Sequence, residues 1–300
     1  MAFVDLIGQS ESIQRLEKSI YENRLSHAYL FFGPAGVGKR TAALALAKRL
    51  LCERPQEIKS CGPCSACLKV EKGVHPDLRL VAVEENSIKI DLIREIQNWL
   101  AIIPFEANRK VVIFDHAEKI SRGAANALLK TLEEPPSHAL MILVAPAVQS
   151  ILPTVASRCQ KIPFRSLTPE ELMEGLKRLS LYDAQIDSIV PWAQGSLGKA
   201  IQLKNQMEEV TALTDGFFSF QKFRSERVAL IEKIFKEREN WEWCYDVIAL
   251  MIRKQIIKEE KGFEWMDALG EFYRALELNV APRIAIERFF YRVEQGGVRV

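Results

Sequence analysis

The sequence has 300 residues, of which 48% are hydrophobic and 27% are charged, and its formal net charge is +2. A compact body of this length buries roughly three quarters of its unfolded surface, and the composition excludes intrinsic disorder, collagen and disulfide-rich miniproteins. The small net charge excludes a strongly basic coat protein for nucleic acid. The start shows no signal-peptide pattern, and Pro146 and Pro153 interrupt the long uncharged stretch 138–157. We therefore expect a cytoplasmic protein without membrane contact.

Short apolar runs alternate with helix-like segments along the first half of the chain. Strands are expected at residues 27–33, 77–83, 110–115, 139–145 and 160–164, and helices at 10–23, 41–51, 91–101 and 124–132. This alternation predicts a doubly wound α/β domain with right-handed crossovers, whose ligands bind at the carboxyl ends of the strands. Strand patterns stop after Phe164, and a capped helix start at Thr168 begins an all-α remainder, with further helical patterns at 228–236 and 241–258.

A glycine-rich run follows the first expected strand and begins a helix rich in alanine and leucine. Residues 33–40 read Gly-Pro-Ala-Gly-Val-Gly-Lys-Arg, the context in which a P-loop binds phosphate through backbone N–H groups and a lysine. The P-loop pattern ends in a Ser or Thr that binds Mg²⁺, but Arg40 stands there, and Thr41 comes one residue late and about 100° around the helix. A turn that binds no ligand is the alternative. The candidate nucleotide-binding residues are Gly33, Gly36, Gly38, Lys39, Arg40, Thr41 and Asp115.

Asp115 ends the expected strand 110–115, as the Walker B aspartate that holds Mg²⁺ does. An active ATPase of this class carries a glutamate next, which activates water, whereas this chain has His116, with Glu118 two residues further on. ATP is therefore a candidate ligand whose hydrolysis we do not expect. A structural cap at the end of the strand is the alternative reading of Asp115.

Four cysteines lie close together in the sequence with the spacing C-x8-C-x2-C-x2-C, namely Cys52, Cys61, Cys64 and Cys67. Four thiolates with two such tight spacings can complete a tetrahedral shell, so the pattern predicts a structural Zn²⁺ in a module at about residues 52–67. A redox pair and unligated thiols are the alternatives, and His75 is an alternative extra ligand. Disulfides are not expected in a chain without an export signal.

Arg158 follows the expected strand 139–145 and lies among small residues in the run Leu-Pro-Thr-Val-Ala-Ser-Arg-Cys, residues 152–159. Such an arginine is either a surface salt-bridge partner or an arginine finger that projects into the phosphate site of a neighbouring molecule. The residues around it leave both interpretations open.

Six features occur together in a fixed order: residues 6–9 (Leu-Ile-Gly-Gln), 27–33, the P-loop, the four cysteines, 126–136 (Asn-Ala-Leu-Leu-Lys-Thr-Leu-Glu-Glu-Pro-Pro) and 157–159 (Ser-Arg-Cys). In this order they resemble the bacterial DNA polymerase III clamp-loader subunits, which are AAA+ proteins. The resemblance covers residues 1–205 well. It implies a P-loop α/β domain at 1–165 that carries the zinc module, a small helical lid domain at 166–205 and a helical oligomerisation (collar) domain at 206–300.

Four substitutions indicate which type of subunit the sequence resembles. Arg40, His116, Pro146-Ala147 and Gly198 stand where the family's motor subunits carry residues for hydrolysis or for sensing phosphate, whereas Arg158 is kept. The resemblance is therefore to the delta prime class, the stator. It implies a hetero-pentamer with gamma/tau and delta subunits that loads a sliding clamp onto primer-template DNA, with Arg158 completing the ATP site of a motor subunit.

The resemblance also implies a component of a DNA polymerase holoenzyme that has no ATPase or polymerase activity of its own. A gamma/tau-type motor that hydrolyses ATP is the main alternative, and a zinc-dependent DNA-binding module is a weaker one because no recognition-helix pattern follows the cysteines. Candidate contacts to DNA phosphates are Lys119, Arg122 and Lys130.

Overall fold

The computed structural model describes residues 6–55, 60–81, 87–181, 190–191, 193–205, 263–278, 280, 284–285, 287–289 and 291–292. The chain divides into two compact units, Met1–Ile201 and Gln202–Val300. Within the described ranges, no helix is long and apolar enough to cross a membrane.

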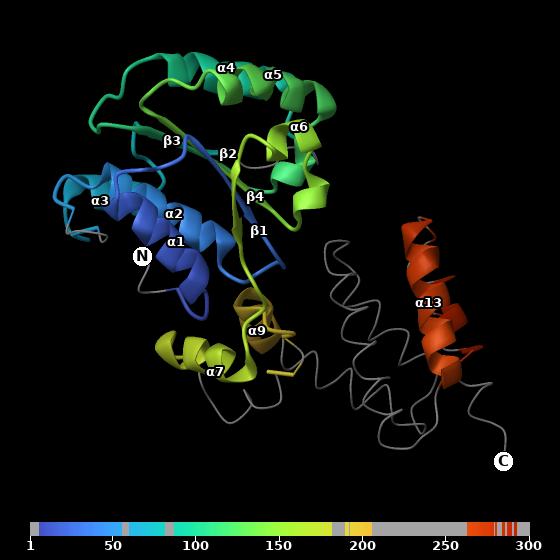
Figure 1. Ribbon diagram of the computed structural model, residues 1–300. Coiled ribbons are helices and arrows are strands. Elements are labelled where there is room, and N and C mark those ends of the chain that lie inside the picture. The colour runs from blue at the N-terminus through green and yellow to red at the C-terminus, as the bar shows by residue number, and fades with distance from the viewer. Residues whose placement is uncertain are drawn as a thin grey trace. The chain divides into compact units, whose positions relative to one another are not determined.

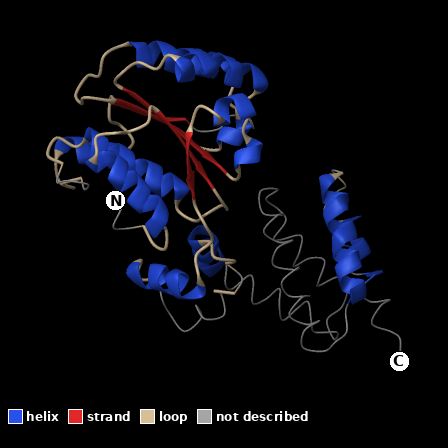
Figure 2. Cartoon of the chain, in the orientation of Figure 1, coloured by secondary structure: helices blue, strands red, loops and turns tan. Residues whose placement is uncertain are grey.

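A five-stranded parallel sheet forms the centre of the first unit (Figures 1 and 2). The strand order is β2-β3-β4-β1-β5, and each pair of neighbours runs parallel. The strands are β1 (Ala28–Phe32), β2 (Leu78–Val81), β3 (Lys110–Phe114), β4 (Ala139–Ala145) and β5 (Gln160–Pro163). The predicted parallel α/β sheet is confirmed, and each strand lies inside the residues expected for it.

Helices cover both faces of this sheet because the buried side chains of its central strands alternate between the faces. Ala28 and Leu30 of β1 belong to a core cluster with α4 and α5, while Tyr29 and Phe31 belong to a second cluster with α1 and α2. In Figure 1, α4 and α5 accordingly lie on one side of the strands and α1 and α2 on the other. The helices are α1 (Ser10–Tyr21), α2 (Lys39–Leu51), α3 (Ser65–Glu71), α4 (Ile90–Ala101) and α5 (Arg122–Glu133).

The segment after the sheet begins with a well-capped helix. In α7 (Pro169–Arg178) the Thr168 side chain accepts from the backbone of Glu171, whose carboxylate accepts from the backbone of Thr168, which is the capping box that the sequence predicts. Arg165, just after β5, adds a two-pronged ion pair to Glu171 at 2.6 and 2.8 Å. Helix α9 (Leu197–Asn205) follows.

In the second unit, the structure describes α13 (Phe263–Glu277) and a few residues after it. Ala268, Leu269 and Phe272 of this helix are buried, and the rings of Phe272 and Phe289 lie 5.8 Å apart between centroids. Most of the expected collar domain, including the helical patterns at 228–236 and 241–258, lies outside the described residues.

Candidate functional site

Three parallel strands bring the predicted phosphate-binding residues to one edge of the sheet. Phe32 of β1 is level with Ala145 of β4, and Phe114 of β3 is level with Leu143. The segments that follow these strands, namely the P-loop, Asp115 and Pro146, therefore lie at the carboxyl edge, where α/β folds bind their ligands.

The P-loop glycines adopt backbone conformations that other residues rarely take. Gly33, Gly36 and Gly38 have φ values of 143°, 70° and 100°. Gly38 precedes α2 without any side-chain cap, so the first N–H groups of the helix remain directed toward the loop. This arrangement suits the binding of an anion, because the helix N-terminus carries partial positive charge.

The Lys39 side chain is buried inside the loop, with 8% of its surface exposed. Its Nζ donates to the carbonyl oxygens of Gly33 and Pro34. Burial lowers the pKa of Lys39, and the carboxylates of Glu118 and Asp115 offset part of that shift. A phosphate group entering the loop would take the place of the two carbonyls as partner of the ammonium.

The positions expected to support hydrolysis carry Arg40 and His116 in place of a hydroxyl and a glutamate. A guanidinium nitrogen of Arg40 lies 3.3 Å from a carboxylate oxygen of Asp115. His116 has a left-handed backbone with φ of 55°, and its Nδ1 lies 3.1 Å from Oε1 of Glu118. Glu118, two residues beyond His116, is therefore engaged by that imidazole.

Gly198, one of the four substituted positions, contacts the P-loop through its backbone. The N–H of Gly198 donates to the carbonyl of Gly36 at 3.0 Å. A Cβ added to Gly198 would lie 3.1 Å from the Cα of Gly36, which is tighter than an ordinary contact. A side chain at this position would therefore require a small shift of one of the two segments.

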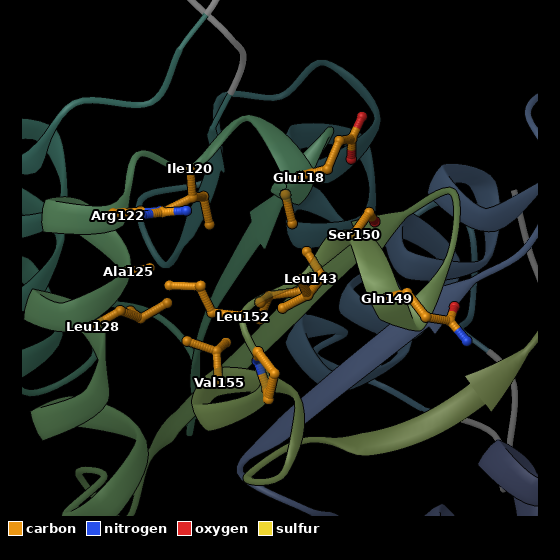
Figure 3. Close-up of a pocket in the computed structure, with 13 residues that line it drawn as sticks. Glu118, Ile120, Arg122, Ala125, Leu128, Leu143, Gln149, Ser150, Leu152 and Val155 are labelled. Carbon is orange, nitrogen blue, oxygen red and sulfur yellow. The ribbon is translucent and has the colours of Figure 1, made fainter.

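A separate pocket of about 260 Å³ lies between α5, β4 and α6 (Pro153–Ala156). Figure 3 shows Leu128, Leu143, Leu152 and Val155 turned toward its interior and Glu118 at one margin. Its lining includes neither the P-loop nor Asp115. The pocket nevertheless shares Glu118 with the surroundings of Lys39, so it lies beside the phosphate edge.

The four predicted cysteines are brought together at the far end of α2. Cys52 ends that helix and Cys64 begins α3, and the four Sγ atoms lie within 4.8 Å of one another. The Cys52–Cys64 and Cys61–Cys67 sulfur distances are 3.9 and 4.0 Å. Because Zn–S bonds of about 2.3 Å in a tetrahedron place sulfurs about 3.8 Å apart, the cluster has the dimensions of a four-thiolate metal shell.

The thiols of the cluster differ in acidity, because burial and the neighbouring Cys64 raise the pKa of Cys67 to about 12. Burial by itself raises the pKa of the Cys64 thiol, but backbone N–H groups, that of Cys67 among them, stabilise the thiolate and lower the pKa to about 6. His75, the alternative extra ligand, is not part of the group. Its Nδ1 instead accepts from the backbone N–H of Asp77 at 3.1 Å.

Asp77 is a structural residue that the sequence analysis did not single out. Its carboxylate is fully buried and accepts hydrogen bonds from the backbone of Phe105, Glu106 and Ala107 at 2.7 to 2.9 Å. Burial alone would raise the pKa of Asp77, but these donors outweigh it and lower the pKa. Glu106 in turn pairs with Lys69 of α3 at 2.6 Å, so this loop braces the cysteine module.

Arg158 lies between α6 and β5, at the opposite edge of the sheet from the P-loop. Tyr29 of β1 is level with Gln160 of β5, so Arg158 precedes the amino end of its strand. Its guanidinium pairs with Glu133 at 2.6 Å and donates to the carbonyl of Thr154 at 2.9 Å. The sequence analysis contained Glu133 only as part of the run 126–136 and did not predict this contact.

Comparison with known proteins identifies the family. The family model described as "DNA polymerase III, delta subunit" matches residues 8–168, which span the P-loop, the cysteines and Arg158. The chain belongs to the DNA polymerase III delta-subunit family.

The relatives include both delta' and tau subunits of DNA polymerase III. Subunit delta' of Bacillus subtilis is 40% identical over 168 residues, covering 56% of this chain and 51% of the relative. Subunit tau of the same organism is 33% identical over 210 residues, covering 68% of this chain and 37% of the relative. The chain thus spans about half or less of the length of these curated relatives.

A solved structure agrees on the fold of the family. The DNA polymerase III, gamma subunit-related protein of Thermotoga maritima superimposes with a TM-score of 0.56, covering 96% of this chain and 99% of that chain. At 19% identity, this likeness concerns the fold alone.

Proposed function

We propose that this chain is a delta prime (stator) subunit of a bacterial DNA polymerase III clamp loader. It assembles with gamma/tau and delta subunits in a hetero-pentamer that loads a sliding clamp onto primer-template DNA. Family membership and the 40% identity to a delta' subunit support this proposal. In it, residues 1–165 are the AAA+ domain, 166–205 the lid and 206–300 the collar.

One observation carries the stator role: the chain keeps Arg158 but replaces the groups for hydrolysis at its own P-loop. Strand β1 has five residues, so it separates the two edges of the sheet by about 16 Å. Arg158 at the amino edge is too far from Lys39 at the carboxyl edge to serve the same nucleotide. If it acts as a finger, it acts on a neighbouring subunit.

The ion pair with Glu133 is compatible with this role. The side chains of Arg158 and Glu133 are 36% and 52% exposed, and exposed pairs of this kind contribute only about 0–1 kcal/mol. A phosphate offered by a neighbouring subunit forms stronger, two-pronged hydrogen bonds with a guanidinium. Glu133 can therefore orient Arg158 before assembly and release it afterwards.

We further propose that Cys52, Cys61, Cys64 and Cys67 hold a structural Zn²⁺. The sulfur distances support this set of ligands. Bound there, the metal would cross-link the end of α2 to α3 and contribute folding energy rather than chemistry.

The proposed function is tested by reconstitution with the gamma/tau and delta subunits of the same organism. The full-length chain should enter a stable complex that loads clamps onto primed DNA. Arg158→Ala should leave assembly unchanged, because its ion pair is exposed, but remove one finger, a group worth about 10³–10⁵ in rate at its site. Bulk ATPase should then fall only in part, since the motor subunits keep their own fingers, while clamp loading falls further.

Arg94→Ala is the matched control, because Arg94 is an exposed arginine on α4 that pairs only loosely, at 3.6 Å, with Asp91. It should behave as the wild type in every assay. Failure of the chain to join the complex would refute the stator role, and normal clamp loading by an assembled Arg158→Ala complex would refute the finger.

A further inference from the structure

The ion pair between Arg40 and Asp115 joins the two positions that hold Mg²⁺ in a P-loop NTPase. Arg40 stands in place of the Walker A hydroxyl, and Asp115 is the Walker B aspartate. The two side chains are 3.3 Å apart, and Asp115 is largely buried, with 23% of its side chain exposed. A cationic side chain of this protein, itself 62% exposed, therefore pairs with the aspartate that would otherwise bind the metal.

The residues present do not fit Mg²⁺. This ion takes oxygen ligands in a near-octahedral shell, and a guanidinium offers only donors. Thr41 carries the nearest hydroxyl in sequence, but it is one position further along α2 and so about 100° around the helix. The carboxylate that remains, Asp115, has Arg40 as its ion-pair partner.

The phosphate-binding half of the site does fit a nucleotide. Gly33, Gly36 and Gly38 keep their positive φ values, and α2 begins without a side-chain cap. The buried ammonium of Lys39 donates to two carbonyl oxygens of the same loop, which a phosphate can replace.

We propose that this P-loop binds nucleoside triphosphate without Mg²⁺, with the Arg40 guanidinium, held by Asp115, in place of the metal. The planar fork of an arginine pairs with two phosphate oxygens at once and keeps its charge at any physiological pH. The inference rests on the proposed function for the identity of the site, since it concerns the same P-loop.

This arrangement makes the effect of Mg²⁺ on binding opposite to that in a motor subunit. In excess Mg²⁺, a nucleotide arrives with a divalent cation on its β and γ oxygens, which are the atoms that Arg40 would contact. Two cations then compete for the same oxygens, so the metal weakens binding. In a P-loop with a hydroxyl at position 40, the metal strengthens it.

The experiment is calorimetric titration of the full-length chain with ATP, once in buffer freed of Mg²⁺ on a chelating resin before the protein is added and once with excess Mg²⁺. No soluble chelator is used, because it would remove zinc from the cysteine cluster. Because a charge-assisted hydrogen bond to Arg40 forms only without the metal, we expect the dissociation constant to be about tenfold lower in the Mg²⁺-free buffer. Arg40→Thr restores the Walker A hydroxyl and should reverse the order, so that ATP binds more tightly with Mg²⁺. Arg40→Lys keeps the cation and should retain the order of the wild type.

Lys39→Ala should abolish binding under both conditions, which assigns the signal to the P-loop. The proposal is overturned if the wild type binds ATP more tightly with Mg²⁺, if it binds no ATP in either buffer, or if folded Arg40→Thr keeps the order of the wild type. Assembly and clamp loading are measured in a separate experiment, and none of these titration results decides them. The failure of this inference and that of the proposed function are therefore distinguishable.

Discussion

Helix α2 joins two sites that differ in how much of their chemistry is present. Its first residue, Lys39, belongs to the P-loop, and its last residue, Leu51, precedes Cys52, the first sulfur of the cysteine cluster. Thirteen residues of α-helix separate the two by about 20 Å. At the cysteine end a cysteine stands at each of the four candidate ligand positions. At the P-loop end Arg40 stands where a metal-binding hydroxyl is expected.

We expect phosphate binding and hydrolysis to depend on separate groups. The P-loop glycines keep the backbone conformation that suits phosphate, although Arg40 and His116 stand at positions expected to support hydrolysis. The cysteine cluster has no comparable division, because each sulfur belongs to the same shell. A single loss should therefore disable the cluster but only modify the P-loop.

The largest expected effect is at the cysteine end. Cys64→Ser should reduce bound zinc from about one equivalent to well under half, because structural zinc sites derive about 10–16 kcal/mol from a complete set of ligands. The α/β sheet should stay folded, since its core clusters do not include the cysteines of the module. Elemental analysis together with far-UV circular dichroism measures both.

Cys159→Ser is the matched control, because Cys159 is a buried thiol outside the cluster whose pKa burial raises to about 12. It should keep the full equivalent of zinc. Equal zinc content in the two variants would contradict the assignment of the ligands.

A smaller effect is expected at the loop that braces the cysteine module. Asp77→Asn keeps the shape of the side chain but weakens three hydrogen bonds to the loop backbone. The free energy of unfolding should fall by about 1–3 kcal/mol, as for other losses of charged, buried acceptors. Urea titration measures it, with Asp91→Asn, an exposed residue of α4, as the control that should change little.

The same carboxylate predicts a dependence on pH. Because the folded protein holds the pKa of Asp77 below its ordinary value, its contribution to stability is complete above the unfolded pKa of about 3.9. It is lost as the pH falls through the lower pKa of the folded state. The difference in stability between the wild type and Asp77→Asn should therefore shrink in acid, and a constant difference would contradict the role of the charge.

The smallest predicted effect is a loss of stability at the start of α7, the helix that follows β5. Thr168→Ala removes the capping hydroxyl of α7, the helix that Arg165 ties to the end of β5 through Glu171. We expect a loss of about 1 kcal/mol in thermal or urea unfolding. Thr168→Ser keeps the hydroxyl and should restore most of it, and a failure to do so would mean that the cap is not the cause.

Local patterns were enough to predict the sheet, because its strands are short apolar runs bounded by turns. Residues 139–145 form β4 as expected, whereas α2 begins at Lys39, two residues before the expected start, since Gly38 takes the left-handed conformation that precedes it. Helix α3 was not predicted, because Cys64 directly before it and Cys67 within it dominate that stretch of sequence.

Contacts between distant segments could not be predicted in the same way. The sequence showed that Arg40 replaces a hydroxyl but not that it pairs with Asp115, because the pairing depends on β1 and β3 ending at the same edge. The same holds for Arg158 with Glu133 and for Gly198 with Gly36. Each of these pairs is set by packing of the fold and leaves no local pattern.

The central claim, that this P-loop does not hydrolyse ATP by itself, is tested most directly by steady-state turnover of the isolated full-length chain in Mg²⁺. The gamma/tau subunit of the same organism provides the reference rate. We predict a rate at least about a hundredfold below that reference, because the group that activates water is absent and such groups contribute about 10²–10⁴ in rate. A rate close to that of the motor subunit, abolished by Lys39→Ala, would contradict the account.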